Sequence, residues 1–192
     1  GWAMANVDSV DITVKGLGGH GAYPHTTKDP IVIAANIVTQ LQTIVSRQIA
    51  PTDPAVVTVG SIHGGTKHNV IPNEVKLQLT LRSYTDEVRN QTLSSIERIV
   101  RGSAISAGLT EEYFPVIEIK DEYTPAVFNN PSLVEKVQRS FVNTLGDDKV
   151  IEVSPVMGGE DFGMFGRVEP IIPTALFWLG AVNNEVYEKA KR

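Results

Sequence analysis

The feature that most constrains the fold is the order in which two hydrophobic periodicities follow one another up to residue 120. Val10, Ile12 and Val14 alternate with polar residues, which is the period of two expected of a strand with one buried face. Strand patterns also cover residues 56–62, 75–81 and 114–119. Between these segments, residues 30–50 and 85–107 carry apolar side chains at helical spacing. The predicted order is therefore β-α-β-β-α-β.

Local start and stop signals support both helices. Asp29 stands where a capping side chain is expected, and Pro30 follows at the first helical position, where its missing N–H costs nothing. Thr85 is the corresponding cap of the second helix, and Gly108 is typical of a helix end. The sequence therefore predicts two capped helices between its strands.

The order of elements is typical of a ferredoxin-like arrangement, in which two helices cover one face of an antiparallel sheet. We assign residues 8–120 to this unit. Its sheet has open edges, so we expect dimerisation through an edge strand. After Pro125 the pattern changes: residues 131–145 and 183–192 favour helix, whereas residues 149–153 and 174–179 favour strand. We expect an α+β chain in which residues 1–7 and 121–192 form an incomplete α/β segment.

Charge and composition exclude several classes of function. The formal charge of −5, from 17 basic and 22 acidic residues, argues against a nucleic-acid surface. The absence of cysteine excludes disulfides, a thiol nucleophile and thiolate metal sites, and it favours the cytoplasm. No stretch approaches the length of about 18 apolar residues that a membrane span needs. A chain that begins with Gly1 and enters a strand pattern almost at once is typical of an excised piece.

A glycine-rich loop, residues 16–25, contains the candidate site residue that stands out most. Glycines flank His20, so the backbone there can approach a ligand closely and leave the imidazole as the one large polar group at the tip. The alternative is an ordinary turn that joins a strand to a helix, and composition alone does not separate these interpretations. No histidine belongs to a helical metal-binding pair, so a surface or structural role is the default interpretation for His25, His63 and His68.

Three segments in a fixed order resemble one enzyme family. Residues 14–31, with Gly18-Gly19-His20-Gly21-Ala22-Tyr23-Pro24-His25, are similar to the lid-domain signature of dinuclear metallopeptidases that include hippurate hydrolases, aminoacylases and carboxypeptidase-like enzymes. The segments 68–72 with 79–82, and 155–162 with Gly158-Gly159-Glu160-Asp161-Phe162, agree with this family in order and spacing. The third segment is most similar to the amidohydrolase branch, which acts on N-acyl amino acids.

The resemblance implies roles for five residues. His20 matches a lid histidine that reaches into the active site of the other subunit and hydrogen-bonds the oxyanion, a role that suits a preorganised donor. Asn69 and Arg82 match groups that contact the substrate, and the planar fork of Arg82 suits a carboxylate. Gly158 and Gly159 match a loop that lines the substrate pocket. The alternative for Arg82 is a surface charge on a sheet.

Two acidic motifs receive no metal-binding role. Glu111-Glu112 is the single Glu-Glu pair, and its place after the second helix does not match the metal-binding Glu-Glu of the family. Glu160 and Asp161 precede a short helix, and we expect one of them to cap it. We therefore predict no metal ligand in this chain.

The implied function is that of a fragment of a metal-dependent amidohydrolase that cleaves N-acyl amino acids. Residues 8–120 would be its dimerising lid, and residues 1–7 and 121–192 would be part of its catalytic domain. Two divalent metal ions, zinc or manganese, would be bound in the full-length enzyme but not in this fragment, which alone would be inactive. The alternatives are a non-catalytic dimerisation module and a small-ligand-binding module of ferredoxin-like fold.

Overall fold

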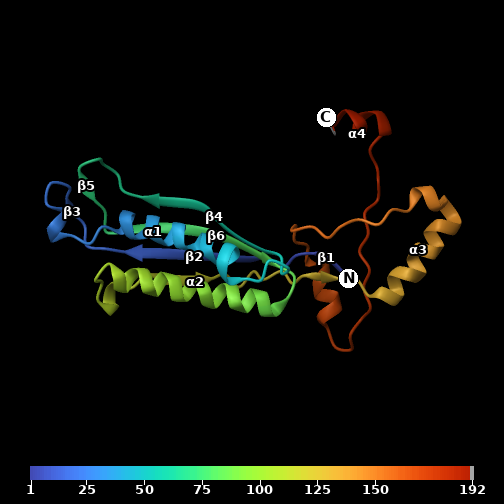
Figure 1. Cartoon of the computed structure of the whole chain (residues 1–192), viewed down its shortest axis with the longest axis horizontal. Helices are drawn as coiled ribbons and strands as arrows, with labels where there is room; N and C mark the ends of the chain where they lie inside the picture. Colours follow the sequence, from blue (N-terminus) through green and yellow to red (C-terminus); the bar gives the residue numbers. More distant parts are fainter. Residues whose placement is uncertain (191–192) are drawn as a thin grey trace.

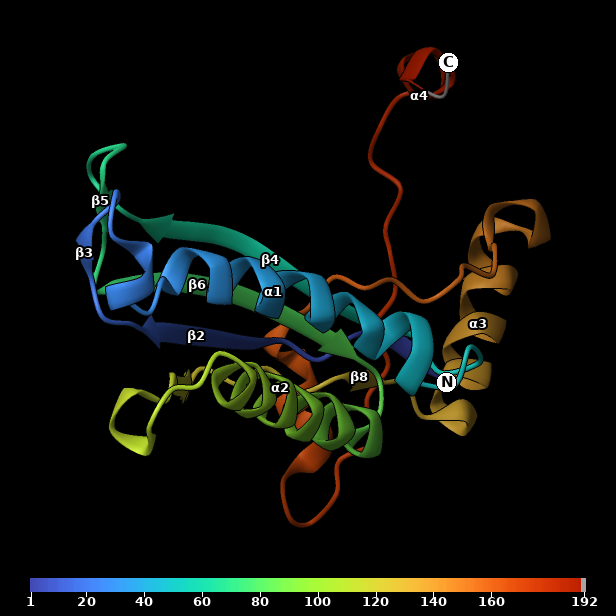
Figure 2. The same ribbon diagram turned by 60° about the vertical axis from the view of Figure 1, so that its left-hand side comes forward.

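The computed structural model describes residues 1–190 (Figures 1 and 2). Its strands are β1 (Trp2–Met4), β2 (Asp8–Lys15), β3 (Gly19–His20), β4 (Ala55–Gly64), β5 (Val70–Ile71), β6 (Glu74–Ser83), β7 (Val116–Ile119) and β8 (Val127–Phe128). Its α-helices are α1 (Pro30–Thr43), α2 (Asp86–Ser106), α3 (Pro131–Leu145) and α4 (Asn184–Ala190). Shorter helical segments are η1 (Pro24–Thr26), η2 (Ile44–Gln48), η3 (Glu111–Tyr113), η4 (Asp147–Lys149) and η5 (Asp161–Arg167).

The main sheet has the strand order β4-β6-β2-β7 and is antiparallel throughout. Val10, Ile12 and Val14 of β2 are fully buried, as their alternation predicts. They pack with α1 and α2, which lie on the same face of the sheet and share its core. Counted along the chain, β2, β4, β6 and β7 are the first to fourth strands of this unit. Their order in the sheet is second, third, first and fourth, which is the order of a ferredoxin-like sheet. The predicted α+β fold is confirmed.

Both helices of this unit begin as the sequence predicts. The Asp29 carboxylate accepts a hydrogen bond from Ile31 N at 2.9 Å, and Pro30 is the first residue of α1. The Thr85 hydroxyl accepts from Val88 N at 3.3 Å at the start of α2. After Thr43 the helix continues as a π-helical turn over Ile44–Gln48. The helical pattern thus continues almost to Pro51, with a wider last turn.

Two of the strands predicted in the last third of the chain are wrong. Residues 149–153 and 174–179 are not strands in the structure, whereas α3 and α4 are helical where predicted. A strand requires a ladder of backbone hydrogen bonds to a neighbour. Within residues 1–190, the 149–153 segment bonds only to the turn before it, and the 174–179 segment makes a single backbone–backbone hydrogen bond to another element, from Asn130 N to Thr174 O at 2.8 Å. Ile151 is 77% exposed and Leu179 is 82% exposed. The predicted helix also included residues 191–192, which lie outside the described part.

Two short connections join the main sheet to the remaining elements. One runs from β1 into β2, the other follows β7, and they are held together by paired backbone hydrogen bonds between Val7 and Thr124, of 2.8 and 3.1 Å. Beyond them, β1 pairs with β8, and α3 and η5 follow (Figure 1). The sheet-and-helix unit therefore meets the rest of the chain at one end of its sheet.

Candidate functional site

His20 lies at the end of the main sheet that is far from these connections. It is the second residue of β3, which pairs with β5, and its side chain is exposed. The Nδ1 atom accepts a hydrogen bond from Ala22 N at 3.1 Å. In the neutral imidazole one nitrogen accepts and the other carries the proton, so this bond places the proton on Nε2. His20 therefore presents an N–H donor to the surroundings.

The glycines of this loop allow close backbone contacts that fix the position of His20. A Cβ atom on Gly18 would lie 2.6 Å from Ile71 O, and Gly18 N donates to Asn73 Oδ1 at 3.0 Å. Gly21 N donates to the backbone oxygen of Asn69 at 2.8 Å. Asn69 is thus held beside His20, with its own side chain exposed. These two predicted site residues are brought together.

Arg82, Gly158 and Gly159 form a second group at the other end of the sheet. Arg82 is half-buried near the end of β6, and a Cβ atom on Gly159 would lie 3.0 Å from its Nη1 atom. The same Cβ would overlap with the Val7 side chain, so this approach requires glycine. Within residues 1–190, the guanidinium of Arg82 makes no hydrogen bond or ion pair. The guanidinium of Arg82 therefore lies beside Gly159 with its N–H donors free to bind a ligand.

The two groups are far apart within one chain. Strand β6 begins at Glu74, near the β3 and β5 end, and Arg82 is eight residues further along it (Figure 1). At a rise of about 3.4 Å per residue, these eight residues of β6 span roughly 27 Å. The His20 group and the Arg82 group lie at the two ends of this span. One chain therefore does not bring the five predicted site residues into a single site.

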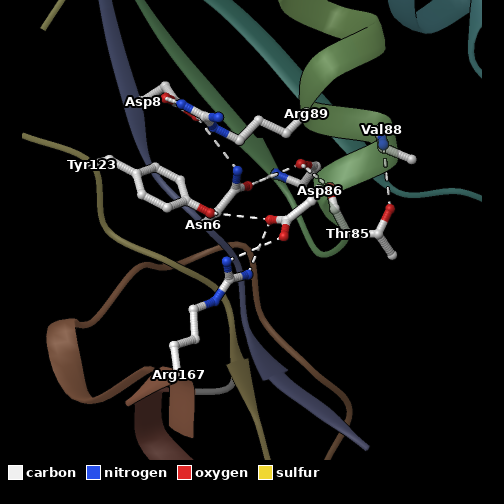
Figure 3. A network of polar contacts seen from close by, with 9 residues as sticks. Asn6, Asp8, Thr85, Asp86, Val88, Arg89, Tyr123 and Arg167 are labelled. Carbon is white, nitrogen blue, oxygen red and sulfur yellow. Dashed lines mark hydrogen bonds and ion pairs between the residues drawn. The ribbon is translucent and has the colours of Figure 1, made fainter. Parts of the chain in front are cut away.

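A network of polar side chains joins the start of β2, the start of α2 and η5 (Figure 3), and the sequence analysis did not identify it. Arg89 donates to both oxygens of the buried Asp8, at 2.8 and 2.6 Å, and its guanidinium lies 4.2 Å from the centre of the Tyr123 ring. Tyr123 Oη donates to Asp86 Oδ1 at 3.3 Å. Arg167 donates twice to Asp86, at 3.1 and 3.0 Å. The two partners of each ion pair are 81 positions apart, so no local pattern indicated them.

The charges of this network shift the titration of its members. Hydrogen bonds from Arg167 lower the pKa of the Asp86 carboxyl, and the positive charges of Arg167 and Arg89 act in the same direction against partial burial. Asp86 is therefore an anion at neutral pH. The hydrogen bonds to Asp8 raise the pKa of Arg89, which stays a cation. The hydrogen bonds to Asp86 likewise raise the pKa of Arg167, so the Arg167–Asp86 pair is fully charged under ordinary conditions.

Comparison with known proteins identifies the family. The family model of the peptidase dimerisation domain, which belongs to the M20 peptidases, matches residues 3–106, more than half of the chain. The chain belongs to this family. The resemblance to the dinuclear metallopeptidase and amidohydrolase family, inferred from three sequence segments, is confirmed.

The proteins that this M20 chain is similar to are described as hydrolases. It is 39% identical over 182 residues to the N-acetyldiaminopimelate deacetylase of Lactococcus lactis subsp. cremoris (strain SK11), covering 95% of this chain and 46% of the relative. A structure described as an aminohydrolase from methicillin resistant Staphylococcus aureus has a TM-score of 0.75 at 32% identity, covering 87% of this chain and 42% of that one. The chain thus spans about half the length of the relatives it matches.

A third relative is described by its metal content. A Bacillus subtilis structure, described as a dinuclear metal binding peptidase from the M20 family, has a TM-score of 0.62 at 26% identity and covers 87% of this chain and 39% of its own. Among residues 1–190 of the present M20 chain, no three or more His, Asp or Glu side chains converge on a position that suits a metal ion.

Glu160 caps η5 by accepting a hydrogen bond from Phe162 N at 3.1 Å, which confirms the predicted cap. No helix in the described part has the length and apolar character of a membrane span.

Proposed function

We propose that this chain is the lid and pocket-loop part of a cytoplasmic, metal-dependent amidohydrolase that releases an amino acid from an N-acyl amino acid. The observation that carries this proposal is the separation of His20 with Asn69 from Arg82 with Gly159, at opposite ends of one sheet. Similarity to an N-acetyldiaminopimelate deacetylase supports the substrate class. Two divalent metal ions, zinc or manganese, would be bound by polypeptide outside residues 1–190 and would supply the hydrolytic chemistry.

The residues of this chain would bind and orient the substrate. The free donors of Arg82 match the two oxygens of an amino-acid carboxylate in a bidentate contact. Gly158 and Gly159 carry no side chain, so the substrate can lie against their backbone. His20 Nε2–H would donate to the carbonyl oxygen as negative charge develops on it, with Asn69 as a neighbouring polar contact. This assignment requires His20 and Arg82 to come from different subunits.

A homodimer through β4 would satisfy that requirement. If β4 strands of two copies pair antiparallel about a twofold axis, the two sheets run in opposite directions, and the His20 end of one lies beside the Arg82 end of the other. Strand β4 is a ten-residue edge that carries Ile62, which is 52% exposed, and Ile31, which is 43% exposed, lies beside Gly65 just after the strand. The other edge, β7, has four residues and ends beside Lys120, which pairs with Asp11 and Glu118. We therefore assign the dimer contact to β4.

Ile62→Lys tests this contact. The substitution removes apolar burial and places like charges together in both copies, and a loss of about 1.4 kcal/mol per copy weakens the dimer about 100-fold. Sedimentation equilibrium of the chain measures this dissociation constant. Val116→Lys on β7 is the matched control, since Val116 is 50% exposed on the opposite edge, and it should leave the constant unchanged. Equal effects of both variants, or an effect of Val116→Lys alone, would place the contact elsewhere.

The substrate class is tested with the complete enzyme. We expect release of an amino acid from N-acetyl amino acids, with a rate that chelators abolish. Arg82→Ala should raise KM for these substrates by about 10- to 100-fold, because a charge-assisted bidentate contact contributes about 1.5–3 kcal/mol. For the matching carboxamides, which lack the carboxylate, Arg82→Ala should change KM little. Equal losses with acid and carboxamide would refute the role of Arg82, and turnover that resists chelators would refute the proposed class.

A further inference from the structure

The loop that follows residue 157 contacts the connection before β2. Ala5 N donates to Gly158 O at 2.9 Å. Gly159 packs against Val7 so closely that a Cβ atom has no room there. Because Val7 pairs with Thr124 of the other connection, a shift of this loop would disturb both. The loop assigned to the pocket therefore also lies against the junction between the sheet unit and the rest of the chain.

The helical turn η5 continues this contact to the second connection. A Cβ atom on Gly163 would lie 2.7 Å from Pro125 O and 2.9 Å from Ala126 O, so the turn packs directly on the backbone of that connection. At the end of η5, Arg167 crosses to the sheet unit and binds Asp86 at the start of α2 (Figure 3). Residues 158–167 thus span the whole junction.

The two ion pairs at this junction differ in exposure. The Asp8 side chain is fully buried, and that of Arg89 is 23% exposed, so this pair is a fixed part of the unit that contains α2 and β2. The Arg167 and Asp86 side chains are 40% and 55% exposed, and their pair bridges two parts of the chain. A solvent-exposed ion pair is weak enough to break and reform in solution. Such a contact can bias the angle at the junction without being needed for folding.

We propose that Arg167 and Asp86 form a latch that sets the orientation of the sheet unit relative to the 158–167 loop and thereby holds Arg82 beside Gly159. Tyr123 supports the latch from the connection, since it donates to Asp86 and stacks on Arg89. Arg167 and Asp86 are positioning residues, because they act through Arg82. The importance of that position for substrate binding rests on the proposed function, but the latch itself concerns geometry alone.

Distance measurement in the 192-residue chain tests the latch without substrate. The chain contains no cysteine, so Ser94→Cys on α2 and Gln138→Cys on α3, both exposed, accept nitroxide labels at two defined places. Pulsed electron paramagnetic resonance should give a distance distribution dominated by one population for the parent chain. Arg167→Gln and Asp86→Asn should each broaden it and raise the share of a second population several-fold, and the double variant should add little to either. Salt near 1 M, where the Debye length is about 3 Å, should have a similar effect.

Controls separate the latch from a general loss of structure. Glu111→Gln removes an exposed ion pair with Arg101, 3.9 Å long and confined to the sheet unit, and it should leave the distances unchanged. The unfolding midpoint of Arg167→Gln should stay close to that of the parent chain. Unchanged distances in both Arg167→Gln and Asp86→Asn would overturn the latch, as would an equal change in Glu111→Gln. Altered distances together with a complete enzyme that lacks amidase activity would leave the latch in place and reject the proposed function.

Discussion

Replacement of His20 by alanine is expected to lower kcat of the complete enzyme by about 100- to 1,000-fold, with a small change in KM. The physical reason is the preorganised donor: Ala22 N occupies Nδ1 at 3.1 Å, so the proton stays on Nε2 and no reorientation is needed when negative charge develops. Steady-state kinetics with an N-acetyl amino acid measures the effect. His25→Ala is the matched control, because His25 is an exposed histidine five residues further along the same loop, and it should retain parental turnover.

A mixed-dimer experiment shows whether His20 acts across the subunits. His20→Ala and Arg82→Ala homodimers should each be impaired at both sites. A heterodimer of the two variants contains one site with both defects and one site with neither, if His20 of one subunit serves the pocket of the other. Mixing equal amounts under conditions that exchange subunits should therefore restore up to about a quarter of the parental activity, because about half of the dimers are then heterodimers and each has one intact site. Failure to recover activity in a verified heterodimer would show that both residues serve the same subunit's site.

The order of strands and helices within residues 8–120 was predictable because the buried apolar side chains follow short-range rules. Val10, Ile12 and Val14 alternate since one face of β2 is buried, and Asp29 and Thr85 cap their helices through neighbouring residues. The strand order β4-β6-β2-β7 then follows from the ferredoxin-like arrangement that this sequence of elements favours. Apolar periodicity is local information, and it was sufficient here.

The predicted strands at 149–153 and 174–179 show where local information fails. Their apolar and β-branched residues fit a buried strand, but strand formation depends on a partner that the segment itself does not encode. Ile151 and Leu179 are left exposed, since neither segment finds a partner along its length within the described residues. The ion pairs escaped prediction for a related reason, since Asp8 and Arg89 are 81 residues apart and meet only in the folded chain. The candidate site was predicted in its residues through family resemblance, but the wide separation of His20 and Arg82 required the structure.

Arg89→Ala is expected to have the largest effect on stability, lowering the free energy of unfolding by about 3–5 kcal/mol. The side chain of Asp8 is fully buried, and Arg89 supplies both of its charge-assisted hydrogen bonds, at 2.8 and 2.6 Å. Apart from these, Asp8 accepts one long contact from Asn6 Nδ2 at 3.4 Å. Without Arg89, the carboxylate must remain charged without its cation or take up a proton at a cost in free energy. The Tyr123 ring also loses the guanidinium stacked on it.

Urea unfolding followed by circular dichroism measures this loss as a lower midpoint with an unchanged slope. Arg101→Ala is the control on the same helix: Arg101 is 61% exposed and lies 3.9 Å from Glu111, so its removal should cost no more than about 1 kcal/mol. Asp8→Asn combined with Arg89→Leu should recover part of the stability lost in Arg89→Ala, because it removes the buried charge together with its partner. Equal stability of Arg89→Ala and Arg101→Ala would show that the buried ion pair does not stabilise the start of β2. The backbone pairing of Val7 with Thr124 would then have to hold that end of the strand in place.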